Sequence, residues 1–107
     1  MYQYNARVKR VVDGDTVDFE VDLGFSIKID IRGRLLNVDT PERGHPDWRL
    51  ATKTCANLLY ENASVEVSGD DEDLHVVIQT QKTGKYGRWL VYIDGVNDEL
   101  AKVWPYE

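Results

Sequence analysis

One short segment of the sequence carries an arginine and two carboxylates around an apolar run. Residues 34–42 read Arg-Leu-Leu-Asn-Val-Asp-Thr-Pro-Glu. A second carboxylate turn, Asp-Gly-Asp-Thr, occupies residues 13–16, and an arginine turn, Lys-Tyr-Gly-Arg, occupies residues 85–88. Carboxylates bind hard cations, and arginines bind phosphate oxygens. Three such segments in one small chain predict a single site that is assembled in space.

The carboxylates of this predicted site suit a metal ion. Asp15 and Asp39 offer hard oxygen ligands, which fit calcium or magnesium much better than zinc or copper. The carbonyl of Thr40, held before the fixed ring of Pro41, is a candidate third ligand. Glu42 follows closely and can accept a proton from a metal-bound or nearby water. Taken alone, however, an Asp-Gly-Asp sequence is usually only a turn, and a loop glutamate is usually only solvated.

The arginines are the complementary half of the predicted site. Arg34 and Arg88 each follow a glycine, and their planar donors match the equatorial oxygens of a phosphoryl group in its transition state. Lys85 and Tyr86 can bind a terminal phosphate and stack on a base. The alternatives are surface salt bridges for the two arginines, an exposed lysine and a barrel-edge tyrosine.

Periodic patterns along the chain predict a mainly β fold with helices (α+β). Strands are expected at residues 4–12, 17–23, 27–32, 64–68, 74–80 and 86–93, and helices at residues 47–62 and 97–103. A curved sheet of this kind closes readily into a small barrel. We therefore expect one domain over residues 1–107, a five-stranded OB-type barrel with a packed helix and a short C-terminal helix.

Several local features of this barrel are also predicted. Asp13-Gly14 is a two-residue hairpin signal, in which Asp13 serves the turn. Asp15 shares the inward parity of the following strand, so it lies at the rim and needs a cation partner. Gly33 interrupts the alternation and predicts a bulge or sharp bend. Asp47 is positioned to cap the first helix.

Composition narrows the class of protein. The net charge of −6 argues against coating nucleic acid through bulk electrostatics, but it leaves room for a local basic cleft. No apolar stretch approaches the roughly 20 residues that span a membrane, and the given sequence shows no signal sequence. The chain as given therefore predicts a cytoplasmic protein unless a signal was removed. We also expect a monomer. Cys55 is the only cysteine, which excludes an intrachain disulfide and predicts a buried, inert thiol. Asp70–Asp73 predicts a solvated hairpin tip.

With these residues in view, the chain resembles the staphylococcal nuclease-like (thermonuclease) family. The match rests on Val-Val-Asp-Gly-Asp-Thr-Val at residues 11–17, on the 34–42 segment and on residues 85–88. Residues 90–93 fit the family's following strand, and residues 100–103 look like the end of its late helix. The resemblance thus covers nearly the whole chain in the right order.

The resemblance implies an OB-barrel nuclease that requires calcium, cuts phosphodiester bonds in DNA and RNA, and leaves a 3′-phosphate. It also implies a role for each matching position. The metal ligands would be Asp15, Asp39 and the Thr40 carbonyl, the phosphate-contacting arginines Arg34 and Arg88, the general base Glu42, and the phosphate-binding pair Lys85 and Tyr86.

Two other hypotheses remain beside the nuclease. The first is a noncatalytic OB-fold module that binds nucleic acid or protein, which the acidic balance of the chain favours. Such modules usually lack one or more of the five charged site residues, all of which are present here. The second is a structural or partner-dependent subunit, because the given sequence stops at Glu107 without the extended C-terminal helix of many members of the resembled family, which could leave apolar surface exposed.

Overall fold

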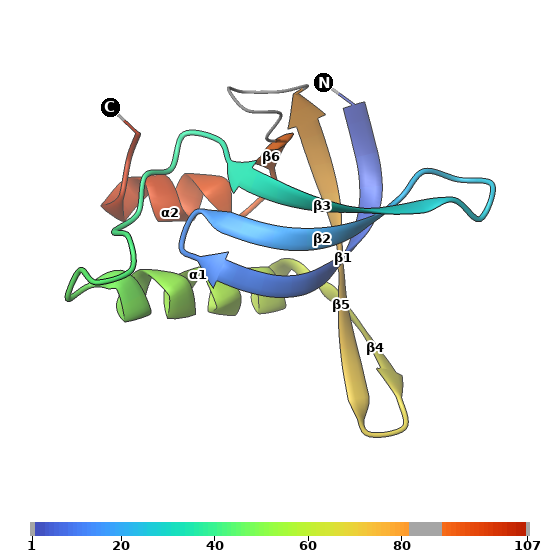
Figure 1. Ribbon diagram of the computed structural model, residues 1–107. Helices are drawn as coiled ribbons and strands as arrows, with labels where there is room; N and C mark the ends of the chain where they lie inside the picture. Colours follow the sequence, from blue (N-terminus) through green and yellow to red (C-terminus); the bar gives the residue numbers. More distant parts are fainter. Residues whose placement is uncertain (1, 82–88, 107) are drawn as a thin grey trace.

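A closed ring of five strands forms the centre of the computed structural model, which describes residues 2–81 and 89–106. The elements are β1 (Tyr2–Asp13), β2 (Thr16–Asp22), β3 (Lys28–Leu35), α1 (Trp48–Asn62), β4 (Ser64–Ser68), β5 (Asp71–Gln81), β6 (Trp89–Tyr92) and α2 (Asn97–Val103). The strands follow the order β1-β2-β3-β6-β5, and pairing of β5 with β1 closes the ring (Figure 1). This mainly β arrangement with two helices is consistent with the predicted OB-type barrel.

The interior of the ring is built from alternate residues of its strands. In β2, Val17, Phe19 and Val21 are fully buried, while the residues between them are half-buried on the outer face. The same alternation brings Ile31 and Leu35 of β3 into the core. Burying such side chains stabilises the fold by about 1.5–3 kcal/mol each. The alternation that was visible in the sequence therefore determines which face of each strand points inward.

Gly33 does not form the predicted bulge. The pairing of β2 with β3 continues without a shift from Thr16 opposite Arg34 to the far end of β2. A Cβ atom at Gly33 would lie 2.8 Å from Val91 Cγ2 and 3.0 Å from Phe19 Cε2. The glycine is needed because β6 and the core approach its backbone closely, and the observed register shifts lie in β1 instead.

The first hairpin turn is one residue later than predicted. Asp13 pairs with Thr16, so the two turn residues are Gly14 and Asp15. This shift takes Asp15 out of the strand and leaves its side chain largely buried at the edge of the ring. Asp13 is the last residue of β1 and lies on the other side of the same turn.

Helix α1 begins and ends where the sequence predicts. Ala51, Cys55 and Leu59 are buried along one face. Burial raises the pKa of the Cys55 thiol to about 12, which agrees with the prediction of a buried, inert cysteine. The predicted cap is wrong, because the Asp47 carboxylate makes no capping hydrogen bond. The Asp47 backbone, with φ −91° and ψ 2°, departs from the extended geometry typical of a capping residue.

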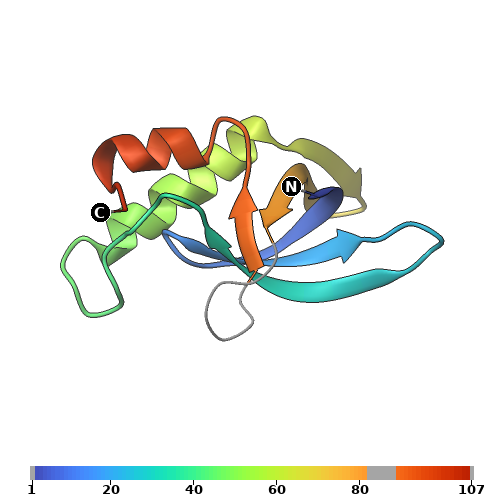
Figure 2. The same cartoon turned by 90° about the horizontal axis from the view of Figure 1, so that it is seen from above.

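Both helices lie on one side of the ring (Figure 2). The β4–β5 hairpin projects away from them, and its exposed turn includes Asp70, as predicted for a solvated tip (Figure 1). Among the described residues, no helix has the length and apolar character needed to cross a membrane.

Candidate functional site

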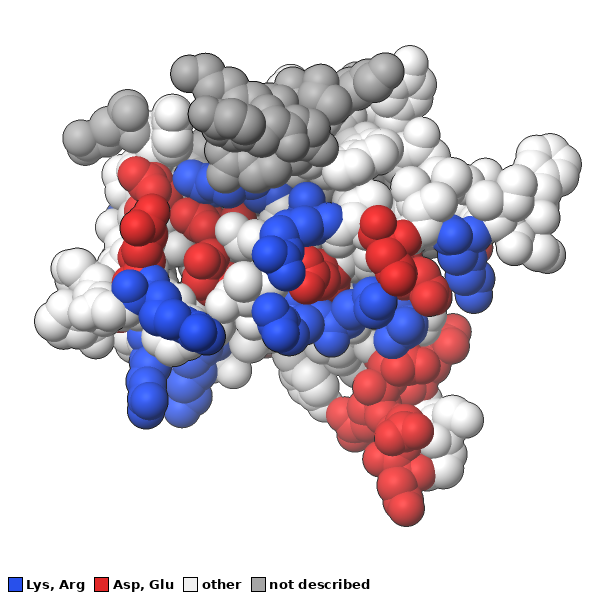
Figure 3. Space-filling view, viewed as in Figure 1, with Lys and Arg blue, Asp and Glu red and all other residues white. Residues whose placement is uncertain are grey.

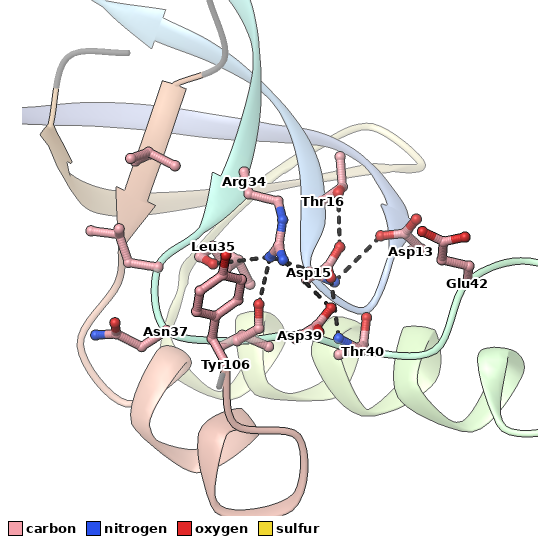
Figure 4. A pocket seen from close by; sticks show the side chains of 13 residues that line it. Asp13, Asp15, Thr16, Arg34, Leu35, Asn37, Asp39, Thr40, Glu42 and Tyr106 are labelled. Atoms are coloured by element: carbon pink, nitrogen blue, oxygen red, sulfur yellow. Dashed lines mark hydrogen bonds and ion pairs between the residues drawn. The ribbon is translucent and has the colours of Figure 1, made fainter. Parts of the chain in front are cut away.

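An open hollow of about 630 Å³ lies where the β1–β2 turn, the end of β3 and the following loop meet (Figure 4). Five of the predicted site residues line it: Asp15, Arg34, Asp39, Thr40 and Glu42. The remaining lining residues are Asp13, Thr16, Leu35, Leu36, Asn37, Val38, Leu90 and Tyr106. The predicted gathering of two distant carboxylate segments is therefore confirmed in space.

Asp15 and Arg34 form the buried centre of the site. Arg34 Nη1 lies 3.3 Å from Asp15 Oδ2, and the two side chains are only 18% and 12% exposed. Thr16 Oγ1 donates a hydrogen bond of 2.9 Å to Asp15 Oδ1, and the Thr40 amide donates one of 3.1 Å to Oδ2. A buried carboxylate needs such partners to remain ionised. The cation that the sequence required beside Asp15 is thus Arg34.

The guanidinium of Arg34 also ties the end of β3 to the loop that follows. Its Nη1 donates to the carbonyls of Val38, at 2.6 Å, and Leu35, at 3.2 Å. Its Nη2 lies 3.7 Å from Asp39 Oδ1. Figure 4 shows Asp15 and Asp39 together beside this group. Within residues 2–81 and 89–106, the Nε atom of Arg34 has no hydrogen-bond partner, so it is the guanidinium atom that a ligand oxygen would have to reach.

The C-terminal segment holds the site loop from outside. The Asp39 amide donates to the Trp104 carbonyl at 3.0 Å, and the Tyr106 amide donates to the Asn37 carbonyl at 3.1 Å. Asn37 adopts a positive φ of 64°, which asparagine tolerates better than most residues. These bonds bring Tyr106 to the hollow, although no local pattern in the sequence indicated it.

Asn97 is a second residue whose role no local pattern revealed. Its side chain is buried at the start of α2, where Oδ1 accepts a bond from the Ile93 amide at 2.8 Å. Its Nδ2 donates to the carbonyls of Leu36, at 3.0 Å, and Val91, at 2.9 Å. Asn97 therefore connects α2 and β6 to the loop that carries Asp39. An asparagine at a helix start suggests only a cap, so finding this role requires the tertiary structure.

The hollow carries more negative than positive charge. Four of its described lining residues are carboxylates, and Arg34 is its single described cation. Burial, followed by the effect of the neighbouring Asp15 carboxylate, raises the pKa of Asp13 to about 6. Asp13 also accepts a long hydrogen bond of 3.4 Å from the Asp15 amide, so it serves the turn as predicted. The sequence predicted only Asp15 at the site, and the spacing Asp-x-Asp across a tight turn is the signal that could have placed Asp13 there as well.

This donor set fits a hard divalent cation. Four carboxylates line the hollow, and Thr40 Oγ1 is a buried polar atom that has no hydrogen-bond partner among the described residues. In the described part of the chain, no three His, Cys, Asp or Glu side chains converge closely enough to make a metal site by themselves. The predicted ligand set needs only Asp15, Asp39 and a carbonyl, with water completing the shell.

Glu42 lies on the rim of the hollow, and its residue is exposed. Figure 4 shows it beside Asp13, to one side of the Asp15–Arg34 pair. The remaining predicted positions, Lys85, Tyr86 and Arg88, lie outside the described residues. Their roles stay predictions.

The chain was compared with models of protein families and with individual known proteins. No family model matches the chain. The sequence is similar to the thermonuclease of Staphylococcus intermedius, at 31% identity over 90% of this chain and 51% of the relative. It is also similar to Protein ParB of Escherichia coli, at 30% identity over 92% of this chain and 46% of the relative. An uncharacterised protein of Methanocaldococcus jannaschii is 35% identical over 84% of this chain and 48% of its own length.

The chain spans about half the length of the curated relatives it matches. The similarity to thermonuclease nevertheless covers nine tenths of the chain described here. It suggests a thermonuclease-like fold, in agreement with the closed ring of five strands.

Proposed function

We propose that the chain is a calcium-dependent nuclease that hydrolyses phosphodiester bonds of DNA or RNA. The observation that carries the proposal is the convergence of Asp15, Arg34, Asp39, Thr40 and Glu42 on one hollow. The similarity to thermonuclease supports it independently of the geometry.

The residues of the hollow would divide the work between binding and proton transfer. Asp15, Asp39 and the Thr40 carbonyl would hold the cation, which when bound supplies a positive charge for the phosphate and lowers the pKa of a bound water. Arg34 would bind a nonbridging phosphate oxygen through the Nε edge of its guanidinium, where Nε makes no hydrogen bond within the described residues. Its ties to Val38 and Asp15 hold that edge in a fixed orientation, which lowers the cost of reorganisation.

In the proposed reaction, one bond forms at phosphorus and one breaks. The water oxygen bonds to phosphorus while Glu42 takes the water proton. The bond from phosphorus to O5′ breaks, and the departing oxygen takes up a proton from solvent. The products are a 3′-phosphate and a 5′-hydroxyl.

A cleavage assay across metal ions tests the proposal. The chain is incubated with end-labelled single-stranded DNA and RNA in calcium, in magnesium and in excess chelator, and the termini of the fragments are identified. We expect cleavage in calcium, much less in magnesium, and none with chelator. Cleavage that persists with chelator would refute the metal requirement, and absence of cleavage under every condition would refute the nuclease.

One observation favours a second function, a noncatalytic OB-fold module that binds nucleic acid or protein. Both terminal nitrogens of Arg34 already contact protein acceptors, so the residue can be explained as a structural tie alone. Under that reading the chain would bind an oligonucleotide or protein with no dependence on calcium and would never cleave. Binding of the labelled strands by anisotropy, measured beside the cleavage assay, separates the two functions.

A further inference from the structure

A second hollow, of about 510 Å³, lies in the loop that follows Glu42 and leads into α1. It is lined by Arg43, Gly44, His45, Pro46, Trp48 and Arg49. The loop begins at the rim of the first hollow, since Glu42 lines one hollow and Arg43 the other. A strand of nucleic acid leaving the first hollow on this side would meet the second.

The aromatic ring of Trp48 holds one of the two arginines in place. The Cζ atom of Arg43 lies 5.0 Å from the ring centroid, within the range of a cation–π contact. Trp48 is half-buried at the start of α1, whereas Arg43 and Arg49 are exposed. Arg43 and Arg49 therefore present their guanidinium groups to solvent, and the half-buried ring of Trp48 supports that of Arg43.

These arginines also differ in charge environment from most other cations of the molecule. Cations with a carboxylate within 4.0 Å are Arg7, Lys9, Lys28, Arg32, Arg34 and Lys102. In the described ranges, no carboxylate lies that close to Arg43 or Arg49, although Asp47 lies in the same loop. Figure 3 shows basic side chains at the end of the molecule where α1 begins, apart from the acidic β4–β5 hairpin.

We propose that Arg43 and Arg49 form a second phosphate subsite, which holds the part of a nucleic-acid strand that flanks the bond cut in the first hollow. The inference rests on the proposed nuclease function. Guanidinium groups bind phosphate oxygens strongly when no carboxylate competes for them. An acidic chain that binds a polyanion needs local positive charge beside its site, and this loop supplies it. Trp48 acts as a positioning residue, because it fixes the guanidinium of Arg43.

Substrate length distinguishes this subsite from the first hollow. We compare cleavage of oligothymidylates of about 2 and about 12 nucleotides in calcium, because only the longer one can reach both hollows. In the double variant Arg43→Gln/Arg49→Gln, the ratio of kcat/KM for the long strand to that for the short strand should fall about tenfold. The slope of log affinity against log salt for the long strand should fall by about 1.4, at roughly 0.7 per phosphate contact on a single strand.

The matched control is Lys9→Gln/Lys28→Gln, which removes the same charge from exposed, ion-paired positions on β1 and β3. This control should leave both the length ratio and the salt slope unchanged. An equal effect of the two double variants would overturn the subsite, since it would show only the influence of net charge. Unfolding midpoints in urea confirm that each variant is folded.

The outcomes also separate this inference from the proposed function. If the unmodified chain cleaves both strands but Arg43→Gln/Arg49→Gln keeps the full length ratio, the subsite is wrong and the nuclease stands. If the unmodified chain cleaves neither strand, the nuclease is wrong and the subsite is wrong with it. If Arg43→Gln/Arg49→Gln keeps the length ratio but no longer binds an acidic protein, the two arginines contact a protein partner. That result would also refute the nucleic-acid subsite.

Discussion

The segments on the two sides of Pro41 are neighbours in the chain, but the rest of the molecule contacts them very differently. Residues 34–40 exchange hydrogen bonds with the β1–β2 turn, with α2 and with the C-terminal segment. The described hydrogen bonds of residues 42–49 stay close in sequence, as in the bond from the His45 amide to the Glu42 carbonyl and that from the Trp48 amide to the His45 carbonyl.

This difference matches what each segment would have to do. Charges that stabilise a transition state are most effective when they are held in place before the reaction, and residues 34–40 provide this rigidity. A loop that contacts flanking nucleotides must accommodate varied strands, and exposed residues with few distant contacts allow this. Mutations in the first segment should therefore have large effects on activity or stability, while those in the second should have small ones.

The largest effect is expected for Arg34→Ala. Loss of the guanidinium removes the predicted phosphate contact and the tie to Val38, so cleavage of single-stranded DNA in calcium should fall by roughly 10²–10⁵-fold. The measurement is the single-turnover cleavage rate at saturating enzyme, with circular dichroism to confirm the fold.

The matched control is Arg32→Ala, two residues earlier on β3. Arg32 is exposed and forms a bidentate pair with Asp18, at 2.8 and 3.2 Å, outside the hollow. We expect its cleavage rate to stay close to that of the unmodified chain. Near-normal turnover in Arg34→Ala would contradict a catalytic role for the first segment, and it would favour the noncatalytic module.

The next effect is on stability rather than chemistry. Asn97→Ala leaves the Ile93 amide and the Leu36 carbonyl without their side-chain partner, while the Val91 carbonyl keeps the Leu36 amide. Unsatisfied buried groups cost roughly 1–3 kcal/mol each, so the loss of two partners should lower the free energy of unfolding by about 2–6 kcal/mol. Urea denaturation measures this change. Asn57→Ala, on the exposed face of α1, is the control and should be nearly neutral.

Asn97 also shows where sequence reasoning reaches its limit. Alternating and helical patterns predicted most of the observed strands and both helices, because burial of one face dominates each element. The motifs predicted that Asp15 and Arg34 would share a site, and they do. The roles of Asn97 and Tyr106 depend on contacts between segments distant in sequence, and no local pattern specifies such contacts.

Gly33 and Asp47 were misinterpreted for a related reason. A glycine within a strand pattern indicates a bulge or a close approach, and only the position of Val91 decides between them. An aspartate before a helix predicts a cap, but the backbone at Asp47 and the bond from its amide to His45 Nδ1 produce another local geometry. In both cases the residue was correctly recognised as structurally special, and the physical cause was assigned wrongly.

A smaller effect is expected where the two carboxylate segments touch. A Cβ atom at Gly14 would lie 2.8 Å from Thr40 Cγ2 and Oγ1 and 2.9 Å from Ala51 Cβ. Gly14→Ala should therefore displace Thr40, lower the free energy of unfolding by roughly 1–3 kcal/mol and reduce cleavage.

The control is Gly69→Ala, at the tip of the β4–β5 hairpin. It tests backbone strain without crowding, since the φ of Gly69 is 62° and open space surrounds it. It should cost about 1 kcal/mol without affecting cleavage, and equal loss of cleavage in both variants would show that Gly14 does not shape the site.

The smallest effect is expected for Asp47→Ala, in the second segment. A carboxylate that caps a helix contributes about 0.5–2 kcal/mol, but that of Asp47 makes no capping bond, so the change in unfolding free energy should stay within about 0.5 kcal/mol. Removing this carboxylate should also strengthen binding of a long oligonucleotide slightly, because it is a negative charge in the loop that carries Arg43 and Arg49. Urea denaturation and anisotropy measure the two quantities on one preparation. A loss of stability above 1 kcal/mol would show that residues 42–49 are held by a contact of Asp47, and the contrast between the two sides of Pro41 would then be smaller than the hydrogen bonds indicate.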